Sequence, residues 1–395
     1  MLCRQKESAM IKRHIAPQLV KLARYFPVVT VLGPRQSGKT TLVKSVFPDH
    51  TYLNMEDADT RAFALQDYKA FFKTYHGPLI LDEIQRVPEL LSAIQVLADE
   101  KREVGKYILT GSHQPLLRAG ITQSLAGRTA ILQLLPFSIA ELSDAGIVLD
   151  RDDYLVRGFL PATYAHGVPP ADLYRSYYAT YVERDVRQIF NIEKQGAFEL
   201  FLKLLAGRVG QLVNLNSMAG EIGVSQPALA SWLSVLEASF IVFRLQPYFT
   251  NFGKRQVKTP KIYFSEPGLV SWLLGIVTPE QAARDPLSGG LFENMVVIEA
   301  LKARYNAGEI PELYYYRSKD GLEIDLILNK ARHIAPIEIK ASRTFSTELA
   351  RNLHTFQKHA NNIASSVVIY GGDVESTVNG IIYANFRNTV KIIYS

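Results

Sequence analysis

The sequence predicts an α/β protein built from several domains. Two observations near its start indicate a parallel sheet: one apolar strand runs directly into a glycine-rich turn and a helix, and another ends in two acidic residues. A third observation comes from the C-terminal part, where helical patterns alternate with short apolar strands. At 395 residues the chain is too long for one average core, so two or three domains are expected.

The composition is that of a folded protein in a reducing compartment. Hydrophobic residues make up 47% of the chain and charged residues 21%. The single cysteine, Cys3, excludes a disulfide framework and a cysteine-rich zinc site, and it fits a cytoplasmic protein. The apolar runs are strand-sized, and the first residues lack the apolar stretch of a signal peptide, so no membrane association is expected. The net charge of +6 permits nucleic-acid binding without demonstrating it.

The strand expected at residues 28–32 is followed by Gly33-Pro34-Arg35-Gln36-Ser37-Gly38-Lys39-Thr40-Thr41, which opens a helix. This loop matches G-x-x-x-x-G-K-[ST] in the strand–turn–helix context that the motif requires. Backbone N–H groups of such a loop surround phosphate oxygens, Lys39 is expected to reach the β- and γ-phosphates, and Thr40 to ligate Mg²⁺. The alternative is a chance glycine-rich turn. The loop therefore predicts a site for ATP and Mg²⁺.

A second apolar strand, residues 79–82, ends in the acid pair Asp82-Glu83. Asp82 is expected to hold the Mg²⁺ through water, and Glu83 to polarise the attacking water. The alternative is that the two acids only cap the helix that follows. Their position after a strand, in a chain that also carries the phosphate loop, favours the catalytic interpretation.

Two further residues are candidates for the same site. A strand at residues 106–109 leads into Thr110-Gly111-Ser112, where Ser112 could sense the γ-phosphate or simply belong to a turn. Arg128 precedes another strand, and an arginine there could stabilise transition-state charge as a finger or sensor. It could equally be a solvated surface arginine.

The ordered motifs GPRQSGKTT, YLNMED, LILDEIQ, YILTGS and SLAGRT, followed by LLPFSIAEL, resemble a bacterial and archaeal family of AAA-superfamily ATPases. Members carry a C-terminal domain of unknown function in which a winged helix precedes a restriction-endonuclease-like segment. The resemblance covers almost the whole chain. It implies an AAA-type P-loop ATPase domain (1–145), a helical lid-like region (146–200), a winged-helix domain (201–280) and a PD-(D/E)XK nuclease-like domain (281–395). AAA relatives often form rings, but the sequence leaves any homo-oligomer open.

The winged-helix prediction rests on a helix-turn-helix pattern with Gly223 at the turn, followed by two strands around a basic loop. Residues 203–261 contain seven basic and two acidic side chains. Four of the basic residues are candidates for phosphate contacts with DNA: Lys254, Arg255, Lys258 and Lys261. The second helix has no Arg or Lys, so strong base-specific readout is not expected. The alternative is a module that only packs between the ATPase and the C-terminus.

A helix acid, Glu293, a strand acid, Asp325, and the pair Glu338 and Lys340 follow the arrangement of the PD-(D/E)XK nuclease superfamily. The three carboxylates are expected to hold a second Mg²⁺ or a Mn²⁺, with Lys340 beside the hydroxide that attacks a phosphodiester. Against this, Glu-x-Lys is frequent in solvated edge strands, and the residue before Ile324-Asp325 is not Pro.

A neighbouring cation gives a further reason for doubt about the metal, because Arg317 is close enough in sequence to neutralise one of the acids. The predicted function is Mg²⁺-dependent ATP hydrolysis coupled to a winged-helix and nuclease-like module that acts on DNA. The alternative is an ATP-regulated DNA-binding or protein-docking switch with an inactive nuclease-like domain.

Overall fold

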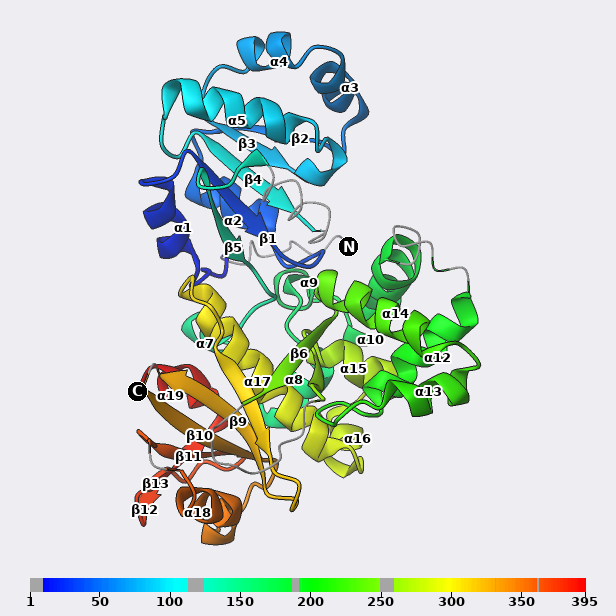
Figure 1. Ribbon diagram of the computed structural model, residues 1–395, viewed down its shortest axis with the longest axis vertical. Coiled ribbons are helices and arrows are strands. Elements are labelled where there is room, and N and C mark those ends of the chain that lie inside the picture. Colours follow the sequence, from blue (N-terminus) through cyan, green and yellow to red (C-terminus); the bar gives the residue numbers. More distant parts are fainter. Residues whose placement is uncertain are drawn as a thin grey trace, which may run out of the picture. The chain divides into compact units, whose positions relative to one another are not determined.

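The structure is a computed structural model that describes residues 10–112, 124–186, 192, 194–248, 259–330, 332–360 and 362–395. It divides into two compact units, each with its own sheet (Figure 1). Unit 1 is Met1–Phe137 with Ala238–Phe240 and Arg304–Glu309. Unit 2 is Ser138–Glu237, Ile241–Ala303 and Ile310–Ser395.

Unit 1 contains a five-stranded sheet in the order β2-β3-β4-β1-β5, with every neighbouring pair parallel. The strands are β1 (Val28–Leu32), β2 (Thr51–Asn54), β3 (Leu79–Asp82), β4 (Tyr107–Gly111) and β5 (Thr129–Gln133). β1, β3 and β4 are buried throughout, as expected for parallel strands covered on both faces. Because the strands are parallel, the carboxyl ends of β1, β3 and β4 meet at one edge, where ligands of such sheets bind.

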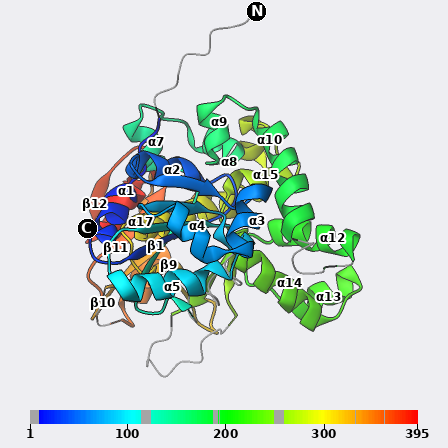
Figure 2. The same cartoon turned by 90° about the horizontal axis from the view of Figure 1, so that it is seen from above.

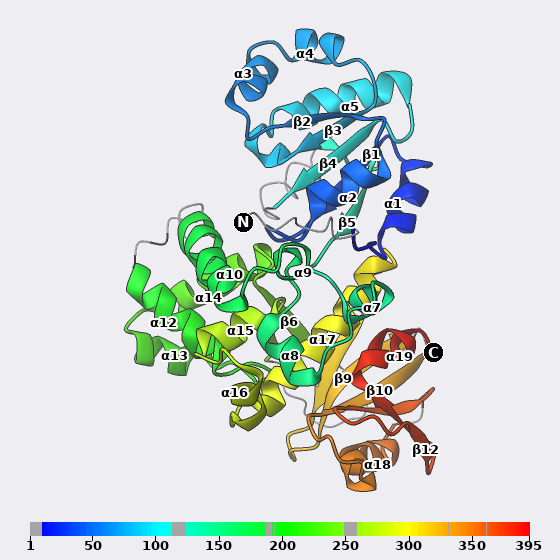
Figure 3. The ribbon, with the colours of Figure 1, turned by 180° about the vertical axis from the view of Figure 1, so that it is seen from behind.

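The helices of unit 1 cover both faces of this sheet. They are α1 (Ala16–Ala23), α2 (Lys39–Val46), α3 (Ala58–Gln66), α4 (Tyr68–Thr74), the short η1 (Ile84–Arg86) and α5 (Leu90–Lys101). Leu19 of α1 and Leu42 of α2 share one core with Val31 of β1. Figures 1 and 3 show α5 on the other side of the sheet from α1 and α2. The expected α/β fold with an N-terminal parallel sheet is confirmed.

The described part of unit 2 is organised around an eight-stranded sheet in the order β12-β13-β11-β10-β9-β8-β6-β7. Its strands are β6 (Val242–Pro247), β7 (Lys261–Phe264), β8 (Leu313–Arg317), β9 (Glu323–Lys330), β10 (His333–Lys340), β11 (Ser366–Tyr370), β12 (Ser376–Val378) and β13 (Ile381–Asn385). β9 and β10 form the expected antiparallel hairpin, whereas β10, β11 and β13 run parallel. β6 pairs with both β7 and β8, so the two strands expected in the winged helix share this sheet.

The helices of unit 2 begin with α7 (Ile139–Asp144), whose first turn is closed by a capping box between Ser138 and Glu141. The others are α8 (Arg151–Arg157), α9 (Pro161–Ala165), α10 (Pro170–Tyr177), η2 (Tyr178–Val186), α12 (Gln195–Ala206), α13 (Leu215–Ile222), α14 (Gln226–Ala238), α15 (Pro267–Leu273), α16 (Pro279–Arg284), α17 (Ser288–Asn306), η3 (Thr347–Ala350), α18 (Arg351–Gln357), η4 (Phe386–Asn388) and α19 (Thr389–Tyr394). Figures 1 and 2 show α12, α13 and α14 side by side. Gly223, at a φ of 75°, makes the turn between α13 and α14.

Candidate functional site

The phosphate loop joins the end of β1 to the start of α2. Two of its residues adopt left-handed backbone conformations: Gln36 has a φ of 61° and Gly38 a φ of 89°. Lys39 is 5% exposed, and its Nζ donates to the carbonyl oxygens of Gly33 at 3.0 Å and Pro34 at 2.8 Å. The ammonium group therefore lies directly over the loop, in the region expected to receive phosphate oxygens.

The charges around this loop act on Lys39 in opposite directions. Burial lowers the pKa of Lys39, while the carboxylates of Glu83 and Asp82 raise it in part. Arg35 of the loop forms a partly exposed ion pair with Glu56 at 3.5 Å, which contributes little to stability. Thr41 is exposed on α2.

Asp82, at the end of β3, is the hub of a network of hydroxyl groups. Its carboxylate accepts hydrogen bonds from Thr40 Oγ1 at 2.8 Å, from the Tyr52 hydroxyl at 2.7 Å and from Thr110 Oγ1. Burial and the bond to Asp82 raise the pKa of Tyr52, so its hydroxyl stays protonated and donates. Thr40 and Asp82 thus place adjacent oxygen atoms beside the loop. These residues fit Mg²⁺, which takes few protein ligands and completes its shell with water and phosphate oxygens.

Glu83 follows β3 in a left-handed conformation with a φ of 54°, which costs a residue with a side chain about 1 kcal/mol. Its N–H donates to Thr110 Oγ1 at 3.2 Å. Its carboxylate accepts from Ser112 Oγ at 3.0 Å and from Gln85 Nε2, and Gln85 Nε2 also donates to Ser112 Oγ at 3.2 Å. These bonds fix the direction of the Glu83 carboxylate and bring Ser112 to it.

Sequence reasoning did not single out Tyr52, Thr110 and Gln85. Each lies in or beside a motif that was recognised, but the register of a parallel sheet is needed to see that they meet. Asn54 pairs with Asp82 and Leu32 with Gly111, so the ends of β2, β3, β1 and β4 coincide. For Thr110 the available signal was a polar residue near the end of an otherwise apolar strand, whereas Tyr52 and Gln85 gave no such signal.

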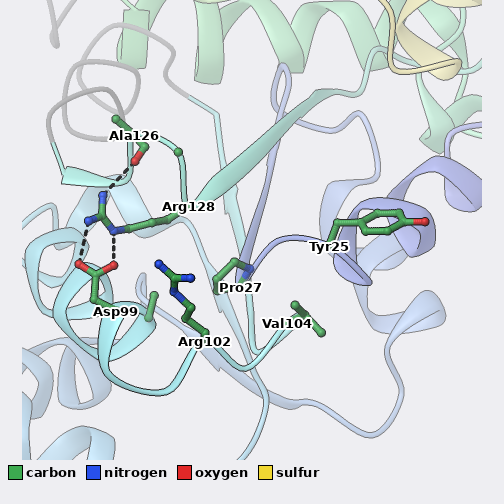
Figure 4. A pocket seen from close by; sticks show the side chains of 9 residues that line it. Tyr25, Pro27, Asp99, Arg102, Val104, Ala126 and Arg128 are labelled. Carbon is green, nitrogen blue, oxygen red and sulfur yellow. Dashed lines mark hydrogen bonds and ion pairs between the residues drawn. The ribbon is translucent and has the colours of Figure 1, made fainter.

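Arg128 lies at the opposite edge of the sheet from the phosphate loop. It precedes β5, whose first residue pairs with Val28, so it is separated from Gly33 by the length of β1, roughly 16 Å. Its guanidinium binds Asp99 at 2.5 and 2.8 Å and the carbonyl of Ala126 at 2.9 Å. Figure 4 shows Arg128 turned toward Asp99. Arg128 is therefore remote from the phosphate loop of its own chain, and its role as a finger or sensor stays a prediction.

Arg128 also lines a surface pocket of about 460 Å³ at this amino edge of the sheet. Figure 4 shows the pocket with Tyr25, Pro27 and Arg102 around it. Because the strands enter the sheet here, the pocket is remote from the carboxyl edge that carries the phosphate loop.

The candidate nuclease-like residues lie in unit 2, and lysines occupy the space between their carboxylates. Glu293 of α17 accepts hydrogen bonds from Lys261 Nζ at 2.9 Å and from the Tyr263 hydroxyl at 2.6 Å. Lys261 also binds Glu323 at 2.5 Å, and Glu323 binds Arg317 at 2.9 Å. Lys261 is 2% exposed. Burial alone lowers the pKa of Lys261, but the surrounding carboxylates raise it above its usual value.

The second half of the cluster is held by Lys340. Its ammonium binds Asp325 at 3.0 Å and pairs with Glu338, which is fully buried. Asp325 also accepts the backbone N–H of Ile339 at 2.8 Å. Burial and the neighbouring Asp325 raise the pKa of Glu338 to about 8, and Lys340 opposes this shift. The same two causes, burial and Asp325, raise the pKa of Glu293.

These contacts correct the expectation that Glu293, Asp325 and Glu338 converge on a second metal ion. Glu293 is bound by Lys261, whereas Asp325 and Glu338 are bound by Lys340. Within the described residues, no group of three His, Cys, Asp or Glu side chains is arranged to hold a metal ion. In the arrangement seen here, with an ammonium group beside each carboxylate, these side chains do not form a Mg²⁺ or Mn²⁺ site.

Of the four basic residues predicted to contact DNA, the structure describes one. Lys254, Arg255 and Lys258 lie outside the described residues. Lys261, the first residue of β7, is internal and paired, so the structure corrects its assignment as a surface contact. Arg208, between α12 and α13, pairs with Glu221 of α13 at 2.8 Å.

Comparison with sequence families gives the class of the N-terminal unit. Residues 25–143 match a family described as an AAA domain. Residues 149–280 and 288–387 match two domains of unknown function, DUF8612 and DUF4143. Residues 25–143 are thus similar to an AAA domain, and the phosphate loop and Asp82 lie at the carboxyl ends of the parallel strands of unit 1. The winged-helix and nuclease-like assignments stay predictions.

Two mycobacterial proteins are similar to most of this chain. Uncharacterized proteins of Mycobacterium bovis and Mycobacterium tuberculosis are each 29% identical over 367 residues, which is 92% of this chain and 80% of the relative. Among solved structures, a Walker-type ATPase of Pyrococcus abyssi is 14% identical and covers 69% of this chain and 98% of its own, with a TM-score of 0.43. AMPPCP-bound DnaA from Aquifex aeolicus is 14% identical, with coverages of 60% and 93% and a TM-score of 0.28. Among the residues that the structure describes, no helix is long and apolar enough to span a membrane.

Proposed function

We propose that this chain is a Mg²⁺-dependent ATPase whose nucleotide state controls unit 2. The observation that carries the proposal is the hydrogen-bonded network at the carboxyl edge of the parallel sheet. There Thr40 binds Asp82, and Glu83 is held by Ser112. The match of residues 25–143 to an AAA domain supports the same chemistry.

In this mechanism Lys39 leaves the loop carbonyls and binds the β- and γ-phosphates. Thr40 and Asp82 would hold the Mg²⁺, which neutralises charge on the phosphates when it is bound. Glu83 orients a water molecule and accepts its proton as the water oxygen attacks the γ-phosphorus, and the bond to the β-phosphate oxygen breaks. The hydrogen bond from Ser112 keeps the Glu83 carboxylate aimed, and it would be rearranged once the γ-phosphate is gone.

Two substitutions test the ATPase. Lys39→Ala should abolish tight ATP binding, because it removes the cation at the phosphate loop. Glu83→Gln should retain binding and stop turnover, because an amide cannot accept the proton. Lys21→Ala, on the exposed side of α1, is the matched control and should behave as wild type. Calorimetry measures the affinity for ATP, and release of inorganic phosphate measures turnover. Hydrolysis retained in Lys39→Ala would refute the assignment.

For unit 2 we propose an ATP-regulated DNA-binding or protein-docking module rather than a metal-dependent nuclease. The ion pairs of Lys261 with Glu293 and Glu323, and of Lys340 with Asp325, favour this alternative, because these ammonium groups lie beside the carboxylates where a metal ion would otherwise bind. The order α12, α13, α14, β6, β7 supports a winged helix as the module that contacts DNA.

The two uses of unit 2 are separated by binding and cleavage assays on the full chain. Reversing the charges of Lys254, Arg255 and Lys258 to Glu should weaken salt-sensitive DNA binding if the loop contacts phosphates. Unchanged DNA affinity would favour protein docking. Incubation with DNA and Mg²⁺ or Mn²⁺ should give no cleavage. Cleavage that is lost in Lys340→Ala would instead establish a nuclease and overturn this part of the proposal.

A further inference from the structure

Arg13, which precedes the residues that match an AAA domain, donates a hydrogen bond to the phosphate loop. Arg13 precedes α1 and lies outside residues 25–143. Its Nη1 donates to the carbonyl oxygen of Ser37 at 2.7 Å, inside the phosphate loop. Its Nη2 donates to the carbonyl oxygen of Leu135 at 2.6 Å, just beyond β5. The guanidinium carbon lies 4.9 Å from the centre of the Phe137 ring.

The segment after β5 also supports the other end of the loop. The Leu134 N–H donates to the Leu32 carbonyl at 2.8 Å, which carries the pairing of β5 with β1 one residue past the strand. A Cβ atom at Gly33 would lie 2.1 Å from the Leu134 carbonyl oxygen, so only glycine fits there. Gly33, the first residue of the loop, thus packs against Leu134, and Arg13 bridges the carbonyl groups of Ser37 and Leu135 by hydrogen bonds.

The contact with Ser37 has a consequence for the phosphate site. In a trans peptide the C=O and the next N–H point in opposite directions. A guanidinium that holds the Ser37 oxygen on the side of residues 135–137 therefore turns the Gly38 N–H to the opposite side. Gly38 is the N-cap residue of α2, and N–H groups at a helix start have no partner within the helix and are suited to bind anions.

We propose that Arg13 is a positioning residue for the nucleotide: it orients the Ser37–Gly38 peptide so that its N–H faces the phosphates. The inference rests on the proposed nucleotide binding and adds a residue to it. Arginine suits the task because its planar fork serves two carbonyl groups at once, whereas a lysine ammonium acts as a single point charge. The bond to Leu135 and the contact with Phe137 fix the guanidinium, so Ser37 is held by a rigid donor.

The test measures nucleotide affinity on the full chain, with AMPPCP and ADP as probes. Arg13→Ala should weaken the binding of both by about tenfold or more, because a hydrogen bond from a charged donor is lost and the loop amide is no longer fixed. Arg13→Lys should lie between the alanine variant and wild type. The matched control is Lys12→Ala, which removes an exposed cation from the same arm. Because Arg13 acts through the orientation of the Ser37–Gly38 peptide, the loss of nucleotide affinity in Arg13→Ala should persist at high salt, where attraction between distant charges is screened.

Hydrogen exchange adds a readout that a general loss of stability would not give. Without nucleotide, amides of the peptide covering residues 33–46 should exchange faster in Arg13→Ala and in Arg13→Lys, while those of β3 should exchange as in wild type. In steady-state hydrolysis the KM for ATP should rise more than kcat falls, because the fixed amide binds ground and transition states alike.

The outcomes separate this inference from the proposed ATPase. If wild type binds nucleotide and Lys39→Ala does not, yet Arg13→Ala and Arg13→Lys bind within twofold of wild type, the positioning role is wrong and the ATPase stands. If wild type binds neither probe, the proposed function itself is wrong. Should Arg13→Ala fail to fold, the affinity and exchange of Arg13→Lys decide the question.

Discussion

Removing the ammonium group of Lys261 should destabilise unit 2 strongly. Lys261→Met keeps the length and apolar stem of the side chain but deletes the charge that bridges Glu293 and Glu323. The two acids are affected unequally. Glu323 keeps its ion pair with Arg317 at 2.9 Å, whereas the partner that Glu293 keeps among the described residues is the neutral hydroxyl of Tyr263.

The expected loss follows from how deeply these groups are buried. Breaking a buried ion pair by removing one partner costs about 3 to 5 kcal/mol, because a charge is left in a poor environment. The Glu293 side chain is 16% exposed, so some solvation remains and a loss of about 3 kcal/mol is expected. Adding Glu293→Gln removes the orphaned charge. The double variant should therefore recover most of the loss, with a coupling of about 2 kcal/mol between the two sites.

Tryptophan fluorescence during urea unfolding measures this change in unit 2 alone. The chain has two tryptophans, Trp232 on α14 and Trp272 on α15, and both belong to unit 2. The denaturation midpoints of wild type, both single variants and the double variant give the coupling directly. A loss below about 1 kcal/mol for Lys261→Met, or strictly additive single variants, would refute the view that Lys261 is the internal counter-ion of this cluster.

Three other substitutions give distinct outcomes. Gly33→Ala should distort the phosphate loop against the Leu134 carbonyl and weaken nucleotide binding by about tenfold or more in calorimetry, whereas unchanged affinity would show that the loop can shift. Arg128→Ala should leave nucleotide affinity within about twofold of wild type, because breaking its exposed pair with Asp99 costs little and the loop is remote; a larger change in dilute protein would contradict this placement. Glu338 has a raised pKa in the folded protein, so its contribution to the free energy of unfolding is present below about pH 4.5 and is lost as the pH rises toward 8. Glu338→Gln should reduce this loss of stability by a few kcal/mol. Equal slopes of unfolding free energy against pH for the variant and wild type would contradict this.

Much of the nucleotide site could be predicted because its residues are adjacent in sequence. The loop from Gly33 to Thr40 is one continuous turn, and the acid pair Asp82-Glu83 ends a single strand. Local sequence cannot report which strands are neighbours. The contacts of Tyr52 and Thr110 with Asp82 come from β2 and β4, so they required the sheet order.

The position of Arg128 also could not be predicted from local sequence. The sequence places it directly before a strand, but it does not say whether that strand runs parallel or antiparallel to β1. The parallel pairing of β5 with β1 decides the question, because the phosphate loop follows the end of β1 while Arg128 precedes the start of β5. A motif that is defined only by order along the chain could not distinguish these edges.

The charge of the segment at residues 203–261, where a winged helix is predicted, illustrates why a count of basic residues is a weak guide to DNA binding. Its two acids are both paired with arginines, Arg208 with Glu221 and Arg244 with Glu237. Lys261 is internal and serves Glu293. Among the described basic residues of the segment, the positive charge that is exposed and not balanced by a paired acid is therefore that of Lys203.

Within residues 203–261, the electrostatic attraction for DNA that the hypothesis requires must consequently come largely from Lys203, Lys254, Arg255 and Lys258. Lys261 belongs to the same basic stretch, yet it begins a strand whose residues are all buried. An isolated cation at the start of a fully buried strand needs acids as partners, and burial without them would cost several kcal/mol. The charge reversal of the three loop residues is therefore the decisive test of the DNA hypothesis, and Lys261 must be left intact in it so that a loss of binding is not caused by unfolding of unit 2.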